Sequence, residues 1–207
     1  MNFEKEKSEV AATMKRLYDR GLTTASGGNV SMRIKDGILI TASQTDKGLI
    51  DASQVGLIDQ DGKVMSGDLK LSMETGMHLA IYAKRPDINA IVHAHPVFAT
   101  SFAISGKIIK TNLAGESRAV LGEPAFAEYA LMGTQHLADL VAGASLKSNA
   151  VLMRNHGVIT LGSSLFQAYD RMEVLEASAK MTFITEFLGG SHDLTVEQLK
   201  EIDNLFI

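Results

Sequence analysis

The stretch Ile91-Val92-His93-Ala94-His95-Pro96 places two imidazoles two residues apart at the end of an apolar run. The run has the composition of a buried β-strand, and alternate side chains of a strand point to the same face, so His93 and His95 should emerge together. Their spacing of roughly 7 Å along a strand lets two ring nitrogens converge on one ion. Pro96 ends the strand, which places the pair where a sheet opens toward solvent.

A third histidine, His156, ends a second apolar run and is followed by Gly157, where the backbone can turn sharply. Three neutral imidazoles with one open position are typical of a catalytic zinc site. A His-x-His pair also occurs in proteins that bind no metal, and a single histidine at a strand end is commonly a hydrogen-bonded core residue. Spacing alone therefore leaves both a metal site and a structural role open.

The composition is that of an ordinary globular protein, with 45% hydrophobic and 21% charged residues among 207. We expect a single domain over residues 1–207, because no segment resembles a linker. The net charge of −4 gives no basis for binding nucleic acid or an anionic membrane. The amino terminus has no apolar signal core, so a cytoplasmic location is expected. Because cysteine is absent, any metal must be held by His, Asp or Glu.

Two turn signals, Asp36-Gly37 and Asp61-Gly62, each separate two apolar runs and predict β-hairpins. Helices and strands alternate after them, which predicts an α/β layered domain with a mixed or largely antiparallel sheet. The residues from 106 to 128 are predicted to be irregular. The predicted helices cover residues 4–20, 73–84, 97–104, 134–144, 163–188 and 195–205, and the predicted strands cover 32–35, 38–41, 55–58, 63–65, 88–93, 149–155 and 157–161.

Glu74 lies in the first turn of a predicted helix, just after Ser72. In that position a glutamate usually interacts with the positive end of the helix dipole, and Ser72 could cap the same end. Beside a metal, however, the carboxylate could act as a general base next to a Lewis acid. His78, His136 and His192 are not expected to be ligands, although His78 should pack or hydrogen-bond close to the site.

Short motifs follow one another in order along nearly the whole chain. They are Gly21-Leu22, Ser26-Gly27-Gly28-Asn29-Val30-Ser31, Asp36-Gly37-Ile38-Leu39-Ile40-Thr41, Ser72-Met73-Glu74, Met77-His78-Leu79-Ala80-Ile81-Tyr82, Arg85-Pro86-Asp87, His93-Ala94-His95-Pro96, Tyr129-Ala130-Leu131-Met132-Gly133-Thr134 and Asn155-His156-Gly157. Together they resemble the zinc-dependent class II aldolase/adducin family, most closely its L-fuculose-1-phosphate aldolase branch. The resemblance implies a three-layer α/β/α fold with a central mixed, mostly antiparallel sheet, and a homotetramer.

The resemblance also implies a reaction and a set of site residues. A ketose 1-phosphate similar to L-fuculose 1-phosphate would be cleaved to dihydroxyacetone phosphate and an aldehyde, through an enediolate stabilised by zinc. The cation would be Zn²⁺, with Mn²⁺ and Co²⁺ as alternatives for an imidazole site. The matching residues are His93, His95 and His156 as metal ligands, Glu74 as the catalytic acid/base, and Gly28, Asn29, Ser43 and Ser72 as the phosphate-binding positions.

Three departures separate the chain from the aldolase pattern. Gln44 replaces a glycine, which would strain the backbone if that position needs a positive φ. Met73 replaces a serine and offers no hydroxyl, for which Lys47 could compensate. No tyrosine falls near Thr111-Asn112-Leu113-Ala114, where certain aldolases use one on the aldehyde oxygen. Tyr129, or a carboxy-terminal residue of a neighbouring subunit, would then have to supply that acid.

The missing tyrosine leaves other reactions of the same scaffold open. These are 3-oxo-tetronate phosphate decarboxylation, methylthioribulose-1-phosphate dehydration and ribulose-5-phosphate 4-epimerisation, which share stabilisation of an enolate by the metal. A non-catalytic module, similar to the head domains of adducin, is a further alternative. The retention of three imidazoles and Glu74 argues against such a module, because it has no need of a metal.

Overall fold

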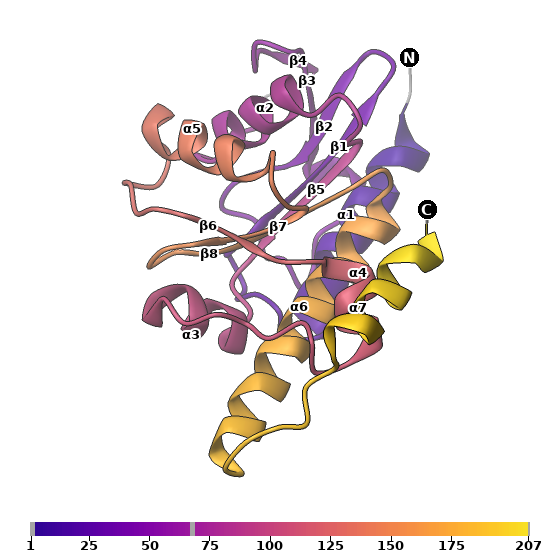
Figure 1. The fold of residues 1–207 in the computed structure, drawn as a ribbon. Helices are drawn as coiled ribbons and strands as arrows, with labels where there is room; N and C mark the ends of the chain where they lie inside the picture. The colour runs from indigo at the N-terminus through magenta and orange to yellow at the C-terminus, as the bar shows by residue number, and fades with distance from the viewer. Residues whose placement is uncertain (1–2, 67–68, 207) are drawn as a thin grey trace.

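The computed structural model describes residues 3–66 and 69–206, which contain one eight-stranded sheet with helices on both faces (Figure 1). The strand order is β4-β3-β2-β1-β5-β8-β7-β6, and every neighbouring pair is antiparallel except β6 with β7. The predicted three-layer α/β/α fold with a mixed, mostly antiparallel sheet is confirmed. The strands are β1 (Asn29–Ile34), β2 (Gly37–Thr41), β3 (Val55–Ile58), β4 (Val64–Ser66), β5 (Ala90–Ala94), β6 (Ala125–Ala127), β7 (Ala150–Met153) and β8 (Gly157–Gly162).

Two apolar cores lie on opposite faces of the sheet, because successive strand residues point to opposite sides. Val92 belongs to the core that α1, α3, α4 and α6 cover, and its neighbour Ile91 to the core that α2 and α5 cover. No helix in the described residues is both long and apolar enough to cross a lipid bilayer. The helices are α1 (Glu4–Asp19), α2 (Thr75–Lys84), α3 (Val97–Ser105), α4 (Gly115–Leu121), α5 (Gln135–Ala144), α6 (Leu165–Phe187) and α7 (Val196–Asp203), with the short 3₁₀ helices η1 (Ala52–Gln54) and η2 (Asn204–Phe206).

The segment 106–128 was expected to be irregular, and this prediction is wrong because it contains α4 and β6. Helix α4 has only seven residues and is stabilised by its contact with α6, where Ser178 donates a hydrogen bond to Ser117 at 2.8 Å. Strand β6 has three residues and pairs in parallel with β7, a partner distant in sequence. Neither element has enough local pattern to be recognised without its tertiary contacts.

The predicted strand 149–155 is too long, because β7 ends at Met153 and residues 154–156 form a turn. Asn155 adopts a left-handed conformation with φ of 53°, which asparagine tolerates better than most residues. The backbone amide of His156 donates to the Met153 carbonyl at 3.2 Å. This tight turn holds His156 at the end of the β7–β8 pair, directly before β8.

Candidate active site

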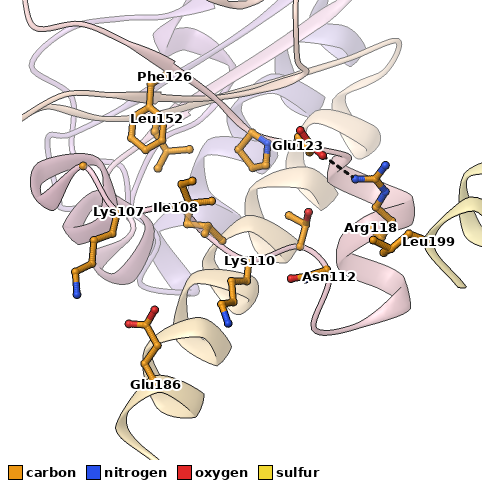
Figure 2. A pocket seen from close by; sticks show the side chains of 14 residues that line it. Lys107, Ile108, Lys110, Asn112, Arg118, Glu123, Phe126, Leu152, Glu186 and Leu199 are labelled. Carbon is orange, nitrogen blue, oxygen red and sulfur yellow. Dashed lines mark hydrogen bonds and ion pairs between the residues drawn. The ribbon is translucent and has the colours of Figure 1, made fainter. Parts of the chain in front are cut away.

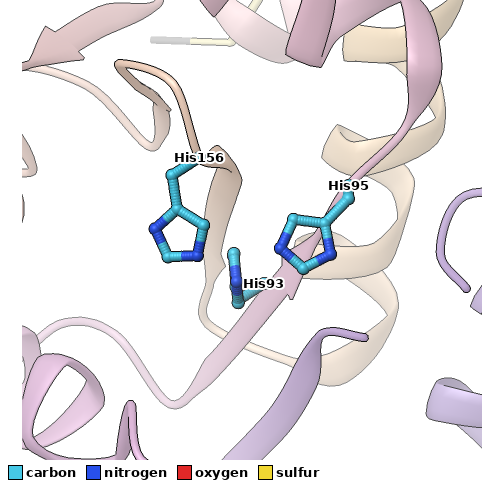
Figure 3. Close-up of side chains that lie close together, drawn as sticks. All are labelled: His93, His95 and His156. Atoms are coloured by element: carbon cyan, nitrogen blue, oxygen red, sulfur yellow. The ribbon is translucent and has the colours of Figure 1, made fainter. Parts of the chain in front are cut away.

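Three histidines converge where the end of β5 meets the start of the neighbouring strand β8, in the middle of the sheet (Figure 3). His93 lies on β5, His95 follows the end of that strand, and His156 precedes β8. The ring centroids are 4.7 Å apart for His93 and His95, 5.0 Å for His93 and His156, and 5.5 Å for His95 and His156. One nitrogen from each ring lies within 4.8 Å of the others, so the side chains predicted to converge do so.

The nitrogen atoms of this cluster are suited to hold a divalent cation. His93 Nδ1 donates to the Val158 carbonyl at 2.9 Å, which leaves the lone pair on Nε2 free. That Nε2 is buried and makes no well-aligned hydrogen bond among the described residues, where it faces the Glu74 carboxylate. Tetrahedral zinc, with Zn–N bonds near 2.0–2.1 Å, spaces its ligands about 3.4 Å apart, so small side-chain rotations would complete the site. Imidazole donors also suit Mn²⁺ and Co²⁺.

The Glu74 carboxylate faces the same histidines. Its Oε2 lies 3.1 Å from His93 Nε2 and its Oε1 lies 2.9 Å from His156 Nε2, with the side chain 11% exposed. Glu74 is the N-cap residue of α2, but its carboxylate makes no capping hydrogen bond. Instead, Ser72 Oγ accepts from the Glu74 amide at 3.3 Å. The usual helix-capping role therefore does not apply to this carboxylate, which is directed at the histidine cluster.

The charge states of the cluster follow from burial and mutual contact. Burial alone would raise the pKa of Glu74, but the facing rings of His93 and His156 hold the pKa of this carboxyl well below its ordinary value. Burial, reinforced by the other two rings, lowers the pKa of His95 to about 3. At neutral pH Glu74 is therefore a carboxylate and His95 is a neutral ring, which is the form of imidazole that binds a metal.

A buried chain of hydrogen bonds runs from Glu74 into the protein. Asn29 Nδ2 donates to Glu74 Oε2 at 3.0 Å, so its Oδ1 is left to accept from His78 Nε2. His78 Nδ1 must then accept from Ser31 Oγ at 2.7 Å, and Ser31 accepts from the Tyr82 hydroxyl at 2.9 Å. His78 is thus a buried hydrogen-bonding residue close to the site and outside the histidine cluster, as the sequence predicted.

A cavity of about 350 Å³ lies beside Glu74 and the histidines. All four positions predicted to bind phosphate line it. Gly28 has φ of 69°, and a Cβ there would lie 2.5 Å from the His93 carbonyl, so no other residue fits. Ser26, Met132 and Asn155 also line the cavity; they lie within motifs of the sequence but were not assigned a role in the site. The lining is Ser26, Gly27, Gly28, Asn29, Ala42, Ser43, Lys47, Ser72, Met73, Glu74, His95, Met132, Asn155 and His156.

The structure shows where the three departures from the aldolase pattern lie relative to the candidate site. Gln44 does adopt a positive φ, 57°, so it occupies a backbone conformation that favours glycine. Met73 lines the cavity without offering a hydrogen bond. Thr111 and Asn112 line a different cavity, of about 810 Å³, near α4 and α6 (Figure 2). Tyr129 is 61% exposed and does not line the site cavity within this chain.

Comparison with known proteins defines the class of this enzyme. Residues 8–183 match the family model for the Class II Aldolase and Adducin N-terminal domain. An L-fuculose phosphate aldolase of Methanocaldococcus jannaschii is 35% identical, over 86% of this chain and 96% of the relative. A solved structure of an L-fuculose 1-phosphate aldolase superposes with a TM-score of 0.92 at 32% identity, covering 100% of this chain and 98% of that chain. The chain therefore belongs to the class II aldolase and adducin family, and it is an enzyme of the class II aldolase type, a lyase.

A relative with a different activity has nearly the same coverage. The 3-oxo-tetronate 4-phosphate decarboxylase of Haemophilus influenzae is 30% identical, over 90% of this chain and 90% of the relative. Family membership therefore leaves the particular substrate to be argued from the site.

Proposed function

We propose that this enzyme is a metal-dependent aldolase that cleaves a ketose 1-phosphate similar to L-fuculose 1-phosphate into dihydroxyacetone phosphate and an aldehyde. The observation that carries the proposal is the convergence of three imidazoles and Glu74 beside one cavity, which Glu74, His95 and His156 line. The L-fuculose phosphate aldolases among its relatives support this substrate class.

Glu74 is the residue that we assign to proton transfer. A divalent cation held by His93, His95 and His156, Zn²⁺ in the first instance, would polarise the substrate carbonyl as a Lewis acid. In the synthetic direction the Glu74 carboxylate removes a proton from the hydroxymethyl carbon of dihydroxyacetone phosphate, and the aldehyde oxygen gains a proton as the carbon–carbon bond forms. In cleavage the hydroxyl of the aldehyde fragment loses its proton and protonated Glu74 delivers a proton to the same carbon, so no net proton is taken up. The electron pair of the broken carbon–carbon bond stays on the phosphorylated fragment. Asn29 fixes the carboxylate by its 3.0 Å hydrogen bond.

The substrate phosphate is assigned to the far part of the same cavity. Gly28 allows backbone N–H groups to approach the phosphate oxygens closely, and the Ser43 and Ser72 hydroxyls add further donors. Asn29, the fourth position, holds Ser72 Oγ by a 3.1 Å hydrogen bond from its Nδ2. These four residues come from three loops and one strand end, so the phosphate would tie the loops together.

The aldolase proposal is tested by metal content and turnover. We expect about one metal ion per wild-type chain, and production of dihydroxyacetone phosphate from L-fuculose 1-phosphate, followed by NADH oxidation in a coupled assay. His156→Ala should lose most of the metal and lower kcat/KM by about 100-fold or more, because two imidazoles bind a divalent cation far more weakly than three. The matched control is His136→Ala on exposed α5, which should change neither quantity. Equal metal content and turnover in both variants would refute the assignment.

A second candidate reaction is decarboxylation of a 3-oxo-tetronate 4-phosphate. It is favoured by the absence of a tyrosine at residues 111–114 and by the Haemophilus influenzae relative. A panel of ketose 1-phosphates, 3-oxo-tetronate 4-phosphate, methylthioribulose 1-phosphate and ribulose 5-phosphate separates the alternatives by product. Carbon dioxide without dihydroxyacetone phosphate would assign the decarboxylase. A non-catalytic module would yield no product and no bound metal.

We also propose that the enzyme is a cytoplasmic homotetramer. The absence of cysteine is consistent with a reducing compartment. Several large apolar side chains are exposed at one end of the molecule, on α3 and at the end of α6, as a subunit interface requires.

A further inference from the structure

Lys47 is a buried lysine without a counter-ion among the residues that the structure describes. Its residue exposure is 1%, and its Nζ donates to the Ala42 carbonyl at 3.0 Å and to Thr45 Oγ1 at 2.8 Å. Both acceptors are neutral, and Lys47 forms no ion pair with any carboxylate in residues 3–66 and 69–206. Burial lowers the pKa of Lys47 to about 8. A buried ammonium of this kind is unfavourable unless an anion joins it.

The side chain of Lys47 lies at the cavity beside the candidate metal centre. Lys47 lines that cavity together with Gly28, Ser43 and Ser72, and among the described residues it is the only lysine or arginine that does so. Its backbone amide donates to the Ala25 carbonyl at 2.8 Å, which ties its loop to the glycine loop. The Lys47 ammonium therefore lies among the groups that we assign to phosphate binding. The other donors in that set are hydroxyls and backbone amides, which are neutral.

We propose that Lys47 binds the anionic end of the substrate, a phosphate monoester, and supplies the positive charge that this subsite otherwise lacks. The inference rests on the proposed function in that the substrate carries a phosphate. A hydroxyl is missing at Met73, and a charge-assisted hydrogen bond from Lys47 would replace it with a stronger interaction. The substrate phosphate would in turn neutralise the buried ammonium.

A purely structural role for Lys47, closing the turn from Ala42, makes different predictions. A structural lysine would stabilise the free protein, and its removal would leave anion affinity unchanged. An anion-binding lysine destabilises the free protein, because its charge is buried without a partner. The two roles are therefore separated by measuring anion affinity and thermal stability in the same variants.

The first experiment measures binding of inorganic phosphate to the metal-loaded full-length protein by calorimetry. Lys47→Met, which keeps the length of the side chain, should raise the dissociation constant by about 10- to 100-fold. Lys47→Arg should retain more of the affinity than Lys47→Met. The matched control is Lys70→Met, an exposed lysine that hydrogen-bonds Gln44 in the adjoining segment, and it should change the constant by less than about 3-fold. Equal phosphate affinity in wild type and Lys47→Met would overturn the inference.

Thermal unfolding of the same proteins adds an independent readout. Phosphate should raise the Tm of the wild type by more than that of Lys47→Met, and Lys47→Met without phosphate should be at least as stable as the wild type. A lower Tm with unchanged phosphate affinity would assign Lys47 a structural role. If Lys47→Met does not fold, NMR of labelled lysines in the wild type replaces it. A Lys47 resonance that titrates near pH 8 and shifts upward with phosphate supports the inference, and one insensitive to phosphate overturns it.

These measurements do not depend on aldolase turnover. Phosphate affinity that requires Lys47, in a protein that cleaves no ketose phosphate, would refute the proposed function and leave the inference standing. Aldol cleavage with a normal KM for the phosphorylated substrate in Lys47→Met would support the proposed function and refute the inference about Lys47.

Discussion

Gln44 occupies a left-handed backbone conformation, directly after Ser43 in the loop that we propose binds the substrate phosphate. This conformation is unfavourable for a residue with a Cβ, whereas glycine adopts it freely. We expect Gln44→Gly to raise the free energy of unfolding by about 1 kcal/mol, after allowing for the greater chain entropy of glycine. The measurement is the urea midpoint at constant m-value.

Asp46→Gly provides the control for Gln44→Gly in the same loop. Asp46 has an ordinary negative φ, and its Oδ1 accepts from the Gly48 amide at 2.9 Å. This variant should therefore lose stability. A destabilising effect of glycine at both positions would show that the conformation of Gln44 carries no strain.

His78 makes the stability of the protein depend on pH. Burial, with a smaller contribution from nearby His93, lowers the pKa of His78 to about 3 in the folded state, whereas an unfolded histidine titrates near 6.5. Between these values the unfolded chain binds a proton that the folded chain does not. Stability is therefore fully present above about pH 6.5 and falls as the pH decreases toward 3, by up to about 1.4 kcal/mol per pH unit.

His78→Gln tests this dependence because glutamine keeps an amide donor but does not titrate. We expect the slope of unfolding free energy against pH, measured by urea unfolding between pH 4.5 and 7, to be shallower in this variant. His136→Gln, at an exposed position, should keep the wild-type slope. Parallel curves for wild type and His78→Gln would exclude His78 as the origin.

At the scale of single residues, the sequence predicted the histidines and the glutamate of the site but not the hydrogen bonds around them. His93, His95, His156 and Glu74 carry distinctive chemistry at recognisable spacings, and the structure brings them together. The series of hydrogen bonds from Asn29 through His78 to Tyr82 could not be inferred, because it depends on how α2 packs against β1. The burial of Lys47 likewise follows from the packing of two loops.

Among the elements, α3 depends on α6 for its start. Pro96 is the N-cap of α3 and provides no side-chain cap, but Glu176 on α6 accepts from the amides of Phe98 at 3.0 Å and Ala99 at 2.8 Å. A carboxylate at this place also interacts favourably with the helix dipole. We expect Glu176→Gln to lower the free energy of unfolding by about 1–2 kcal/mol in urea denaturation.

Glu186→Gln, at an exposed position near the end of the same helix, is the control for Glu176→Gln. Its carboxylate forms no ion pair among the described residues, and the substitution should change the free energy of unfolding by less than about 0.5 kcal/mol. Equal losses in the two variants would mean that removing a negative charge from α6, rather than uncapping α3, is responsible.

The elements differ in how far their sequences predict them. Both hairpins were predicted, because each is specified by a local turn, and the structure pairs Ile34 with Gly37 across the first. The ends of the six predicted helices lie within about two residues of the observed ends. Methods of assigning helix ends differ from one another by a similar amount. Helix α4 and strand β6 were missed because their stability comes from partners on α6 and β7.

Helix α3 and the end of α6 lie toward the same end of the molecule (Figure 1). Both carry exposed apolar side chains. Val97 and Ile104 on α3 and Phe183 and Phe187 on α6 are all exposed, and Phe187 is 84% exposed. The two helices are in contact, with the rings of Phe98 and Phe183 centred 5.8 Å apart. Exposed side chains of this size favour association with another subunit.

Light scattering should give the wild type a mass four times that of the 22.3 kDa chain. Phe187→Glu should shift the mass toward smaller species, because a charge would be buried at the interface. Glu186→Gln, one residue away, should keep the wild-type mass. A monomeric wild type at micromolar concentration would refute the homotetramer.

The position of β1, β5 and β8 in the middle of the sheet has a consequence for how such an enzyme can change. Asn29 is in register with His93, and His93 with Ile159, so these side chains are braced by strands on both sides. Ser43, Lys47 and Ser72 instead stand on connections outside the strands. Insertions or replacements in those connections can change the substrate specificity without changing the distances among the three histidines. Laboratory evolution toward substrates with a different anionic group would therefore begin with residues 42 to 50, where Ser43 and Lys47 lie.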